Sequence, residues 1–256
     1  MMCLAAGLSL AGKIPFVSTY GVFCTGRAWD QLRTTVAYAK LNVKVGSGHG
    51  GVSVGADGAT HQALEDISIT RTIPNVTVIV PADYNETVKA TILSASIQGP
   101  VVIRFGREKV PVVTTKETPF EVGRAEVFRD GKDVSLIACG QMVYESLVAA
   151  GILAKKGISA RVINCHTVKP LDRETIFAAA RETGAIVTAE EHQVMGGFGS
   201  AIAEAVSQNC PVPMRMIGIQ DTFGQSGDPE ELMKAYELTG QDIAKAALDV
   251  IAMKKG

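Results

Sequence analysis

The densest group of residues that could do chemistry lies in a glycine-rich segment, residues 46–62. It holds five glycines before Asp57 and one after it, together with His49 and His61. Glycine lets the backbone approach a ligand closely and adopt positive φ angles, and histidine exchanges protons near neutral pH. We therefore expect this segment to bind a ligand. Two alternatives stay open: a metal site, although the spacing lacks the helical register of typical zinc motifs, and a flexible turn with surface histidines.

Two aromatic rings follow an apolar run in the same half of the chain. Tyr20 and Phe23 belong to the segment 18–23, directly after the run Ile14–Val17, and aromatic residues make up only 5% of the chain. Rings at the end of a strand could stack on a flat heterocycle. Packing of both rings in the core is the alternative, and the residues alone do not decide between them.

Two arginines end another apolar run. Arg104 and Arg107 flank Phe-Gly at the end of the run from Val101. A charged side chain at the end of a buried strand needs a partner or a ligand, and the guanidinium group is suited to bidentate binding of phosphate or carboxylate. Ion pairs with nearby acids are the alternative.

A second glycine-rich turn, residues 196–199, precedes a predicted helix. Such turns can hold phosphate groups, but this one lacks the full dinucleotide-binding fingerprint, so close packing of a helix on a strand is favoured. The residues just before it, Glu190-Glu191-His192, could be catalytic. An acid pair after a strand is, however, as often solvated or structural.

The elements that must position these residues alternate along the first half of the chain. Apolar runs predict strands over 14–20, 43–45, 76–80 and 101–105, and helices over 28–40 and 83–97. Asp83 and Glu86 form a capping-box pattern at the start of the second helix. The strands are almost continuously apolar, which is typical of a parallel sheet buried on both faces.

A break over residues 108–123, rich in proline and threonine, predicts a linker. A second alternation follows, with strands expected over 133–139, 158–165, 185–189 and 212–219 and helices over 142–156, 172–183, 197–207, from 228 onward and 239–254. We therefore predict an α/β protein with two successive domains, residues 1–115 and 116–256. Each should contain a mainly parallel sheet flanked by helices.

Composition limits the classes of partner and compartment. The net charge of −1 gives no case for nucleic-acid binding. The five cysteines are widely spaced, which argues against a disulfide framework and favours a reducing, cytoplasmic location. Residues 2–11 predict a buried helix that begins without a capping residue. Lys13 and Pro15 divide the apolar N-terminal stretch into pieces too short to span a membrane.

Several short motifs, each weak alone, together resemble one family. Those that resemble the pyrimidine-binding domain of transketolases are Ser18-Thr-Tyr20, Asp30-Gln31, Gly55–Gln62 and Arg104–Arg107. Those that resemble the transketolase C-terminal domain are Lys169–Asp172, Glu191-His192 followed by Gly196–Gly199, and Phe223–Gly227. The resemblance covers essentially the whole chain, in order, and it is to the C-terminal half of an enzyme split into two subunits.

The resemblance implies a cofactor, thiamine diphosphate with Mg²⁺ or Ca²⁺, whose diphosphate and metal are held by an N-terminal partner subunit; this chain would supply no metal ligand. It implies that Tyr20 stacks on the aminopyrimidine ring and that Phe23 lines the same pocket. His49 and Arg107 would bind the phosphate of a sugar phosphate. Asp57 and His61 would bind donor hydroxyls, with His61 also assisting proton transfer as the catalytic residue.

The implied reaction transfers a two-carbon ketol unit from a ketose phosphate to an aldose, as in pentose phosphate metabolism. The implied assembly is a heterotetramer with a homodimer of this chain at its core. The alternatives are a subunit of a related enzyme, such as deoxyxylulose-phosphate synthase or a 2-oxoacid dehydrogenase β subunit, and a non-catalytic assembly partner. The last arises because the family's cofactor-activating Glu would precede Met1, which we interpret as an N-terminal truncation or a start assigned too late. We expect the chain alone to be inactive and, if this start is genuine, the complex with a partner subunit to have little or no activity as well.

Overall fold

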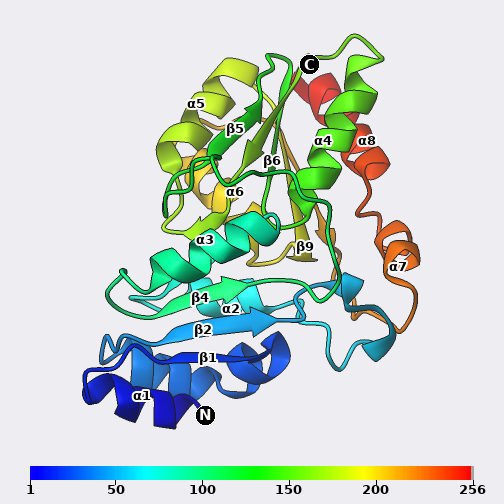
Figure 1. Cartoon of the computed structure of the whole chain (residues 1–256). Helices are drawn as coiled ribbons and strands as arrows, with labels where there is room; N and C mark the ends of the chain where they lie inside the picture. Colours follow the sequence, from blue (N-terminus) through cyan, green and yellow to red (C-terminus); the bar gives the residue numbers. More distant parts are fainter. Residues whose placement is uncertain (255–256) are drawn as a thin grey trace.

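The computed structural model describes residues 1–254 of the 256-residue chain. It contains two α/β domains, each built on a five-stranded sheet that is mostly parallel and flanked by helices (Figure 1). The lower domain in Figure 1 begins the chain and the upper domain ends it. The predicted fold class is therefore confirmed. The boundary predicted after residue 115 falls in a stretch without strands or helices, residues 105–125, and its position remains a prediction.

The first sheet carries the strands that matter for the candidate site. Its order is β1-β2-β4-β3-β8, and its first four strands are parallel. Their bounds are β1 Phe16–Tyr20, β2 Lys44–Gly48, β3 Thr77–Ile79 and β4 Val101–Arg104. All four predicted strands are present. β4 is buried along its whole length, whereas the edge strand β1 is largely half-buried or exposed.

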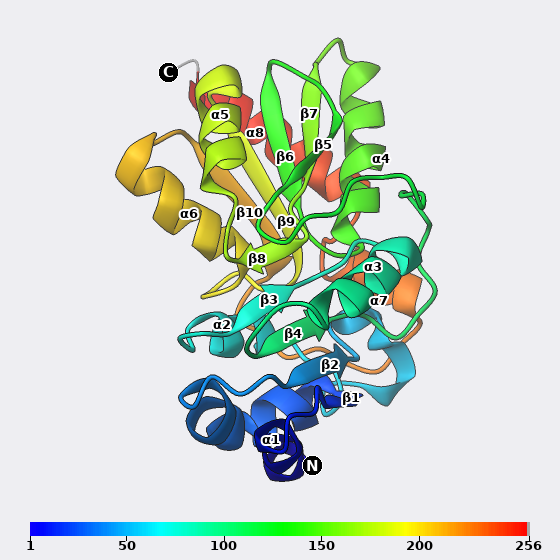
Figure 2. The ribbon, with the colours of Figure 1, turned by 60° about the vertical axis from the view of Figure 1, so that its left-hand side comes forward.

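The fifth strand of this sheet comes from the second half of the chain. β8, Thr167–Lys169, pairs antiparallel with β3, as Figure 2 shows between the two domains. The sequence did not predict it, because three residues next to the strand predicted over 158–165 carry no periodicity of their own. The strand continues the first sheet into the upper domain and so joins the two domains through backbone hydrogen bonds.

The helices of the first domain depart from the predictions in two places. They are α1 Met2–Leu10, the π-helical segments η1 Val22–Arg27 and η2 Gln31–Ala37, the 3₁₀ segment η3 Val52–Asp57, α2 Asp66–Arg71 and α3 Tyr84–Ser94. The helix predicted over 28–40 is the shorter π-helical segment Gln31–Ala37, and a separate π-helical segment that was not predicted, Val22–Arg27, precedes it. The expectation that α1 is buried was wrong, since Leu4 and Leu10 are 70% and 76% exposed. Its buried side chains are the smaller face, Met2, Ala5 and Ala6.

The predicted N-cap of α3 is confirmed, whereas the reciprocal bond of the predicted capping box comes from the Ala82 amide and not from the Asp83 amide. The Asp83 carboxylate accepts a hydrogen bond from the Glu86 amide (3.1 Å), and Glu86 in turn accepts one from the Ala82 amide (2.8 Å). Asp83 also accepts bonds from the backbone amides of Val113 (2.8 Å) and Thr114 (2.7 Å). One carboxylate therefore begins the helix and holds the predicted linker against it.

The second sheet has the order β10-β9-β6-β7-β5, with β5 antiparallel to β7 and the other pairs parallel. Its strands are β5 Glu126–Arg129, β6 Val134–Ala138, β7 Ala160–Asn164, β9 Ile186–Gln193 and β10 Met214–Ile219. Its helices are α4 Met142–Ala154, α5 Arg173–Thr183, α6 Phe198–Asn209, α7 Pro229–Ala235 and α8 Gly240–Lys254. β5 was not predicted, and β9 runs four residues past the predicted end, so Glu190–His192 lie within a strand. Within residues 1–254, no helix combines the length and apolarity that crossing a membrane requires.

Candidate functional site

The predicted ligand-binding residues gather at one edge of the first sheet. β1 ends at Tyr20, β2 at Gly48 and β4 at Arg104, and these strands are parallel neighbours. The glycine-rich segment 46–62, hereafter the glycine-rich loop, leaves the carboxyl end of β2. Because the carboxyl ends of parallel strands meet at the same edge, residues 29 to 50 positions apart come into contact there.

Four rings form a cluster at this edge. The Tyr20 ring stacks on His49, with centroids 3.6 Å apart and planes 19° apart. Phe23 lies 5.8 Å from Tyr20 with nearly parallel planes, and His61 meets both rings edge-on at 5.5 and 5.6 Å. Tyr20 and Phe23 are only half-buried. Packing in the core therefore does not cover these two rings completely, and part of their surface is accessible to a flat ligand.

The His49 backbone has an unusual conformation. Its φ is +57°, in a region that non-glycine residues seldom occupy. Hydrogen bonds fix it there: the Ala63 amide donates to the His49 carbonyl (3.1 Å), and the Gly50 amide donates to the Phe105 carbonyl (3.1 Å). Partial burial and, next, the charge of Arg107 lower the pKa of His49. The imidazole is therefore held neutral against Tyr20 at neutral pH.

His61 is oriented by its neighbour in the chain. Its Nδ1 lies 2.9 Å from the Thr60 hydroxyl. This contact engages one ring nitrogen and leaves Nε2 to meet a ligand. The geometry suits proton exchange with a bound hydroxyl.

Arg107 and Asp57 lie together beside the rings. Arg107 Nη1 is 3.6 Å from the Asp57 carboxylate and donates to the Val54 carbonyl at 2.9 Å. The Arg107 side chain is 41% exposed. The structure thus brings all six predicted site residues together. The exposed guanidinium group of Arg107 lies at the edge of this group of residues.

Arg104 has a different environment from Arg107. It is buried, with Nε 2.9 Å from an Asp66 carboxylate oxygen, and Nη2 donates to the Ala63 carbonyl (3.1 Å) and to the Glu191 carbonyl (2.8 Å). Of the two alternatives that the sequence left open for this arginine, the ion pair is correct. Arg104 thus stabilises the glycine-rich loop from the buried side, where it packs against Gly50 and binds the Ala63 carbonyl.

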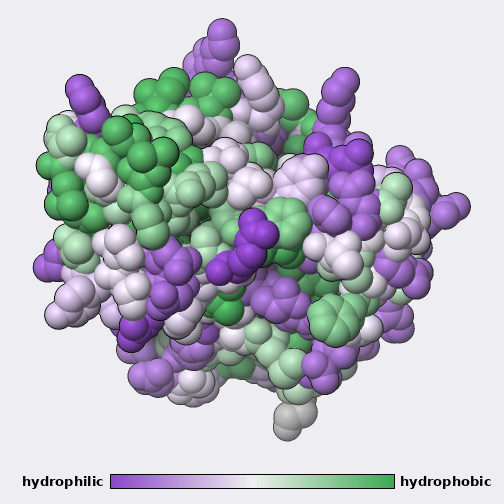
Figure 3. All heavy atoms as spheres, turned by 90° about the horizontal axis from the view of Figure 1, so that it is seen from below, coloured by the Kyte–Doolittle hydropathy of each residue, from purple (hydrophilic) through white to green (hydrophobic). Residues whose placement is uncertain are grey.

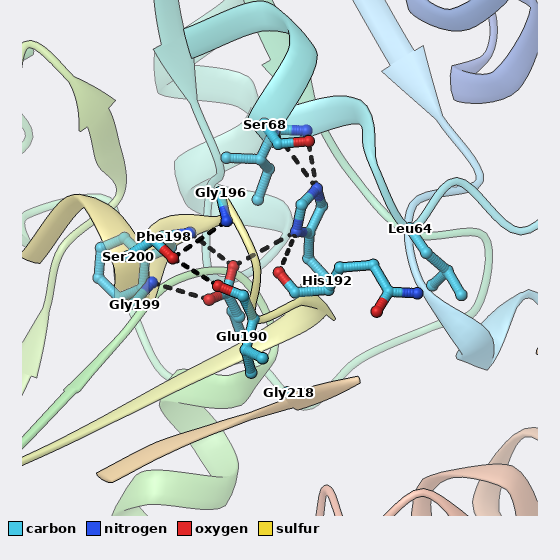
Figure 4. A network of polar contacts seen from close by, with 12 residues as sticks. Leu64, Ser68, Glu190, His192, Gly196, Phe198, Gly199, Ser200 and Gly218 are labelled. Atoms are coloured by element: carbon cyan, nitrogen blue, oxygen red, sulfur yellow. Dashed lines mark hydrogen bonds and ion pairs between the residues drawn. The ribbon is translucent and has the colours of Figure 1, made fainter. Parts of the chain in front are cut away.

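The second glycine-rich turn already binds an acidic side chain of its own chain, that of Glu190. The Glu190 carboxylate accepts hydrogen bonds from the amides of Phe198 (2.6 Å) and Gly199 (2.7 Å), the first residues of α6 (Figure 4). Burial raises the pKa of Glu190 to about 8. The close-packing interpretation of residues 196–199 is therefore confirmed, and no phosphate is needed there.

His192 is likewise structural. Its Nε2 accepts hydrogen bonds from the amides of Ile67 (3.1 Å) and Ser68 (3.4 Å), and Nδ1 donates to the Gln193 carbonyl (2.7 Å) (Figure 4). Burial lowers its pKa to about 4, so the ring is neutral. The possibility that residues 190–192 are solvated was wrong.

Sequence reasoning missed the residues that connect the two domains at this site. Glu191 Oε1 accepts a hydrogen bond from the Ser53 amide in the glycine-rich loop (2.6 Å), and Gln141 contacts the other Glu191 oxygen. No local pattern indicates this contact, because 138 positions separate Glu191 from Ser53. A cavity of about 430 Å³ between the domains adjoins Gly50, Gln141 and Glu191.

The chain's potential metal and sulfur chemistry is limited. Within residues 1–254, no group of three or more His, Cys, Asp or Glu side chains could hold a metal ion. All five cysteines are free thiols. The ring cluster and the Arg107–Asp57 pair form the candidate site for an organic, anionic ligand.

Comparisons with known proteins agree along the whole chain. The family "Transketolase, pyrimidine binding domain" matches residues 1–113, and "Transketolase, C-terminal domain" matches residues 123–243. A putative transketolase C-terminal section from Methanocaldococcus jannaschii is 43% identical over 258 residues, covering all of this chain and 80% of that protein. A 6-deoxy-6-sulfo-D-fructose transketolase subunit from a Clostridium species is 42% identical, covering 99% of this chain and 79% of that protein.

A solved structure has the same fold throughout. It is described as a split gene transketolase, inactive β4 tetramer, and it matches with a TM-score of 0.94 and 46% identity. The match covers 99% of this chain and 81% of that one.

Proposed function

This chain belongs to the transketolase family and matches C-terminal subunits of split enzymes. We propose that it is the subunit of a split transketolase that binds the sugar substrate and the aminopyrimidine ring of the cofactor. The enzyme would transfer a two-carbon ketol unit from a ketose phosphate to an aldose acceptor. The observation that carries the proposal is the gathering of Tyr20, Phe23, His49 and His61 at the carboxyl edge of the first sheet. Asp57 and Arg107, from the loops after β2 and β4, lie 3.6 Å apart beside these rings.

The rings fit one part of thiamine diphosphate, the cofactor of this family. Tyr20 and Phe23 are half-buried and nearly parallel (17°), so they offer a surface for the aminopyrimidine ring. A groove of about 420 Å³ beside Phe23 also reaches Thr19, Arg27 and the first residues of α1. The bound cofactor supplies the electron sink for cleavage of the carbon–carbon bond. An N-terminal partner subunit would hold its diphosphate and a Mg²⁺ or Ca²⁺ ion.

The remaining residues suit a phosphorylated sugar. Arg107 would bind the terminal phosphate through its exposed guanidinium, with neutral His49 donating a hydrogen bond to the same group. Asp57 would accept hydrogen bonds from donor hydroxyls. His61 would do the same through Nε2 and exchange a proton there, so its role is catalytic.

Assembly and location follow from the same proposal. The chain would join an N-terminal subunit as the homodimeric core of a heterotetramer. The exposed apolar face of α1 supports a subunit contact (Figure 3). Five free cysteines support a reducing, cytoplasmic compartment.

The test is to mix the chain with an N-terminal transketolase subunit, thiamine diphosphate and Mg²⁺ and to measure ketol transfer. Transfer from a ketose phosphate to an aldose supports the proposal. Decarboxylation of pyruvate without ketol transfer would instead support a synthase-type or oxoacid-type enzyme. A stable complex without either reaction would indicate an assembly partner.

A further inference from the structure

Glu191 is a C-terminal-domain residue whose carboxylate acts on the other domain. It lies in β9, is 4% exposed, and accepts a hydrogen bond from the Ser53 amide at 2.6 Å. Gln141 donates to the same carboxylate and to the Ser53 hydroxyl (3.1 Å). The glycine-rich loop is thereby tied at its middle to the second sheet.

The loop is shaped to accept this carboxylate. Gly51 has φ +98°, and a Cβ at this position would overlap the Glu191 carboxylate. Glycine is thus required at this position both by its backbone angle and by the closeness of the acid. The fit leaves little freedom for the loop to change its path between His49 and Ser53.

A second set of contacts holds the C-terminal part of the glycine-rich loop, residues 58–62. Gln62 Nε2 donates to the Gln225 carbonyl (2.9 Å) and to the Val52 carbonyl (3.1 Å). A Cβ on Gly58 would meet the Ser226 hydroxyl. The segment 224–227 of the C-terminal domain therefore packs against the part of the loop that contains Asp57 and His61.

We propose that Glu191 is a positioning residue, which sets the path of the glycine-rich loop and so places His49, Asp57 and His61 for the sugar substrate. Its effect on substrate rests on the proposed function, whereas its effect on the loop does not. The cofactor-facing rings, Tyr20 and Phe23, lie on β1 and η1 and do not contact Glu191. The C-terminal domain thereby acquires a role in substrate binding without touching substrate.

The neighbouring acid supplies a matched control. Glu190 is also fully buried, but its carboxylate binds the amides of Phe198 and Gly199 within its own domain. A change at Glu190 disturbs the C-terminal domain without removing a bond to the loop. Comparing the two positions separates positioning of the loop from general damage to the domain.

The first measurement is amide hydrogen exchange in the full chain. Glu191→Ala should raise exchange over residues 50–62 about tenfold or more, because the buried hydrogen bond that the Ser53 amide donates to Glu191 is lost. Glu191→Gln, which keeps an acceptor for the Ser53 amide, should show a smaller increase. Glu190→Gln should leave this segment as in the wild type. Gly51→Ala, which disturbs the same contact from the loop side, should loosen the same residues even if Glu191→Ala folds poorly.

The second measurement uses the complex with an N-terminal subunit. Glu191→Ala should raise KM for the ketose phosphate about tenfold while affinity for thiamine diphosphate stays within about twofold. Unchanged exchange over residues 50–62 in both Glu191→Ala and Gly51→Ala overturns the proposal, as does an equal increase in Glu190→Gln. If the wild-type complex transfers no ketol group, the proposed function fails, and the exchange data still decide whether Glu191 positions the loop.

Discussion

At the scale of single residues, similar side chains in one motif have opposite roles. Arg104 and Arg107 are three positions apart, yet Arg104 is buried against Asp66 and Arg107 stands exposed beside Asp57. Burying an unpaired charge is costly, so the inner arginine needs its acid. The outer arginine keeps a solvent-facing guanidinium that can bind an anion.

Arg107→Ala should raise KM for phosphorylated donors much more than KM for free sugars. Loss of a charge-assisted hydrogen bond to phosphate predicts a 10- to 100-fold decrease in kcat/KM, to an order of magnitude. Steady-state kinetics of the assembled enzyme with paired phosphorylated and free donors measure this. Arg124→Ala, which removes an exposed arginine paired with Glu174, is the matched control. Equal losses with both kinds of donor would argue against a phosphate role.

At the scale of elements, a few polar side chains set where helices begin and how loops dock. Asp83 caps α3 and also binds the amides of Val113 and Thr114. Asp228 caps α7 through the amides of Glu230 and Glu231, but it is more exposed and holds no distant segment. The Asp83 carboxylate therefore stabilises both a helix start and a distant segment, whereas the Asp228 carboxylate stabilises only a helix start.

Asp83→Ala should lower the free energy of unfolding by about 3 kcal/mol, because it removes a cap and leaves buried amides without an acceptor. Asp228→Ala should cost about 1 kcal/mol, the usual value of an exposed cap. Urea unfolding followed by circular dichroism measures both. Equal losses at the two positions would show that the contacts to residues 113–114 add no stability.

His166, just before β8, contacts the linker. We expect the stability of this contact between the linker and the second domain to fall at acid pH. Its ring stacks on Phe120 at 4.1 Å, and burial lowers its pKa to about 4. The unfolded chain therefore binds a proton at this residue between pH 6.5 and 4 that the folded chain does not. Lowering the pH through this range should favour unfolding.

His166→Phe keeps the stacking and removes the titration. Between pH 6.5 and 4, the unfolding free energy of the wild type should fall more than that of the variant, by up to roughly 3 kcal/mol. Urea titrations at several pH values measure the difference. Parallel curves for the two proteins would contradict this prediction.

At the scale of the whole molecule, the lower face exposes an apolar surface over α1 (Figure 3). Leu4, Leu8 and Leu10 are exposed there, next to Ile14 and the edge-strand residue Phe16. An exposed apolar patch of this kind usually marks a contact with another chain.

Leu4→Lys should weaken association of the isolated chain, because a charge would enter the apolar contact. Sedimentation velocity should show a shift toward smaller species at equal concentration. Ile92→Lys, which changes a similarly exposed residue on α3, should leave the assembly unchanged. A mass distribution identical to wild type in Leu4→Lys would place the contact elsewhere.

The sequence by itself determined the alternation of strands and helices and the caps at Asp83 and Asp228, and its resemblance to the family predicted the six residues of the candidate site. The alternation and the caps depend on local periodicity and on capping chemistry. The sequence also indicated the family, through motifs that are weak alone and specific together.

Only the tertiary structure decided the exposure of α1, the pairing of β8 with β3, the separate fates of Arg104 and Arg107, and the reach of Glu191 to Ser53. Each depends on side chains or strands brought together from distant parts of the chain, and the last joins residues 138 positions apart. Local periodicity carries no signal for such contacts, because the partner and the solvent exposure are set only when the two sheets pack.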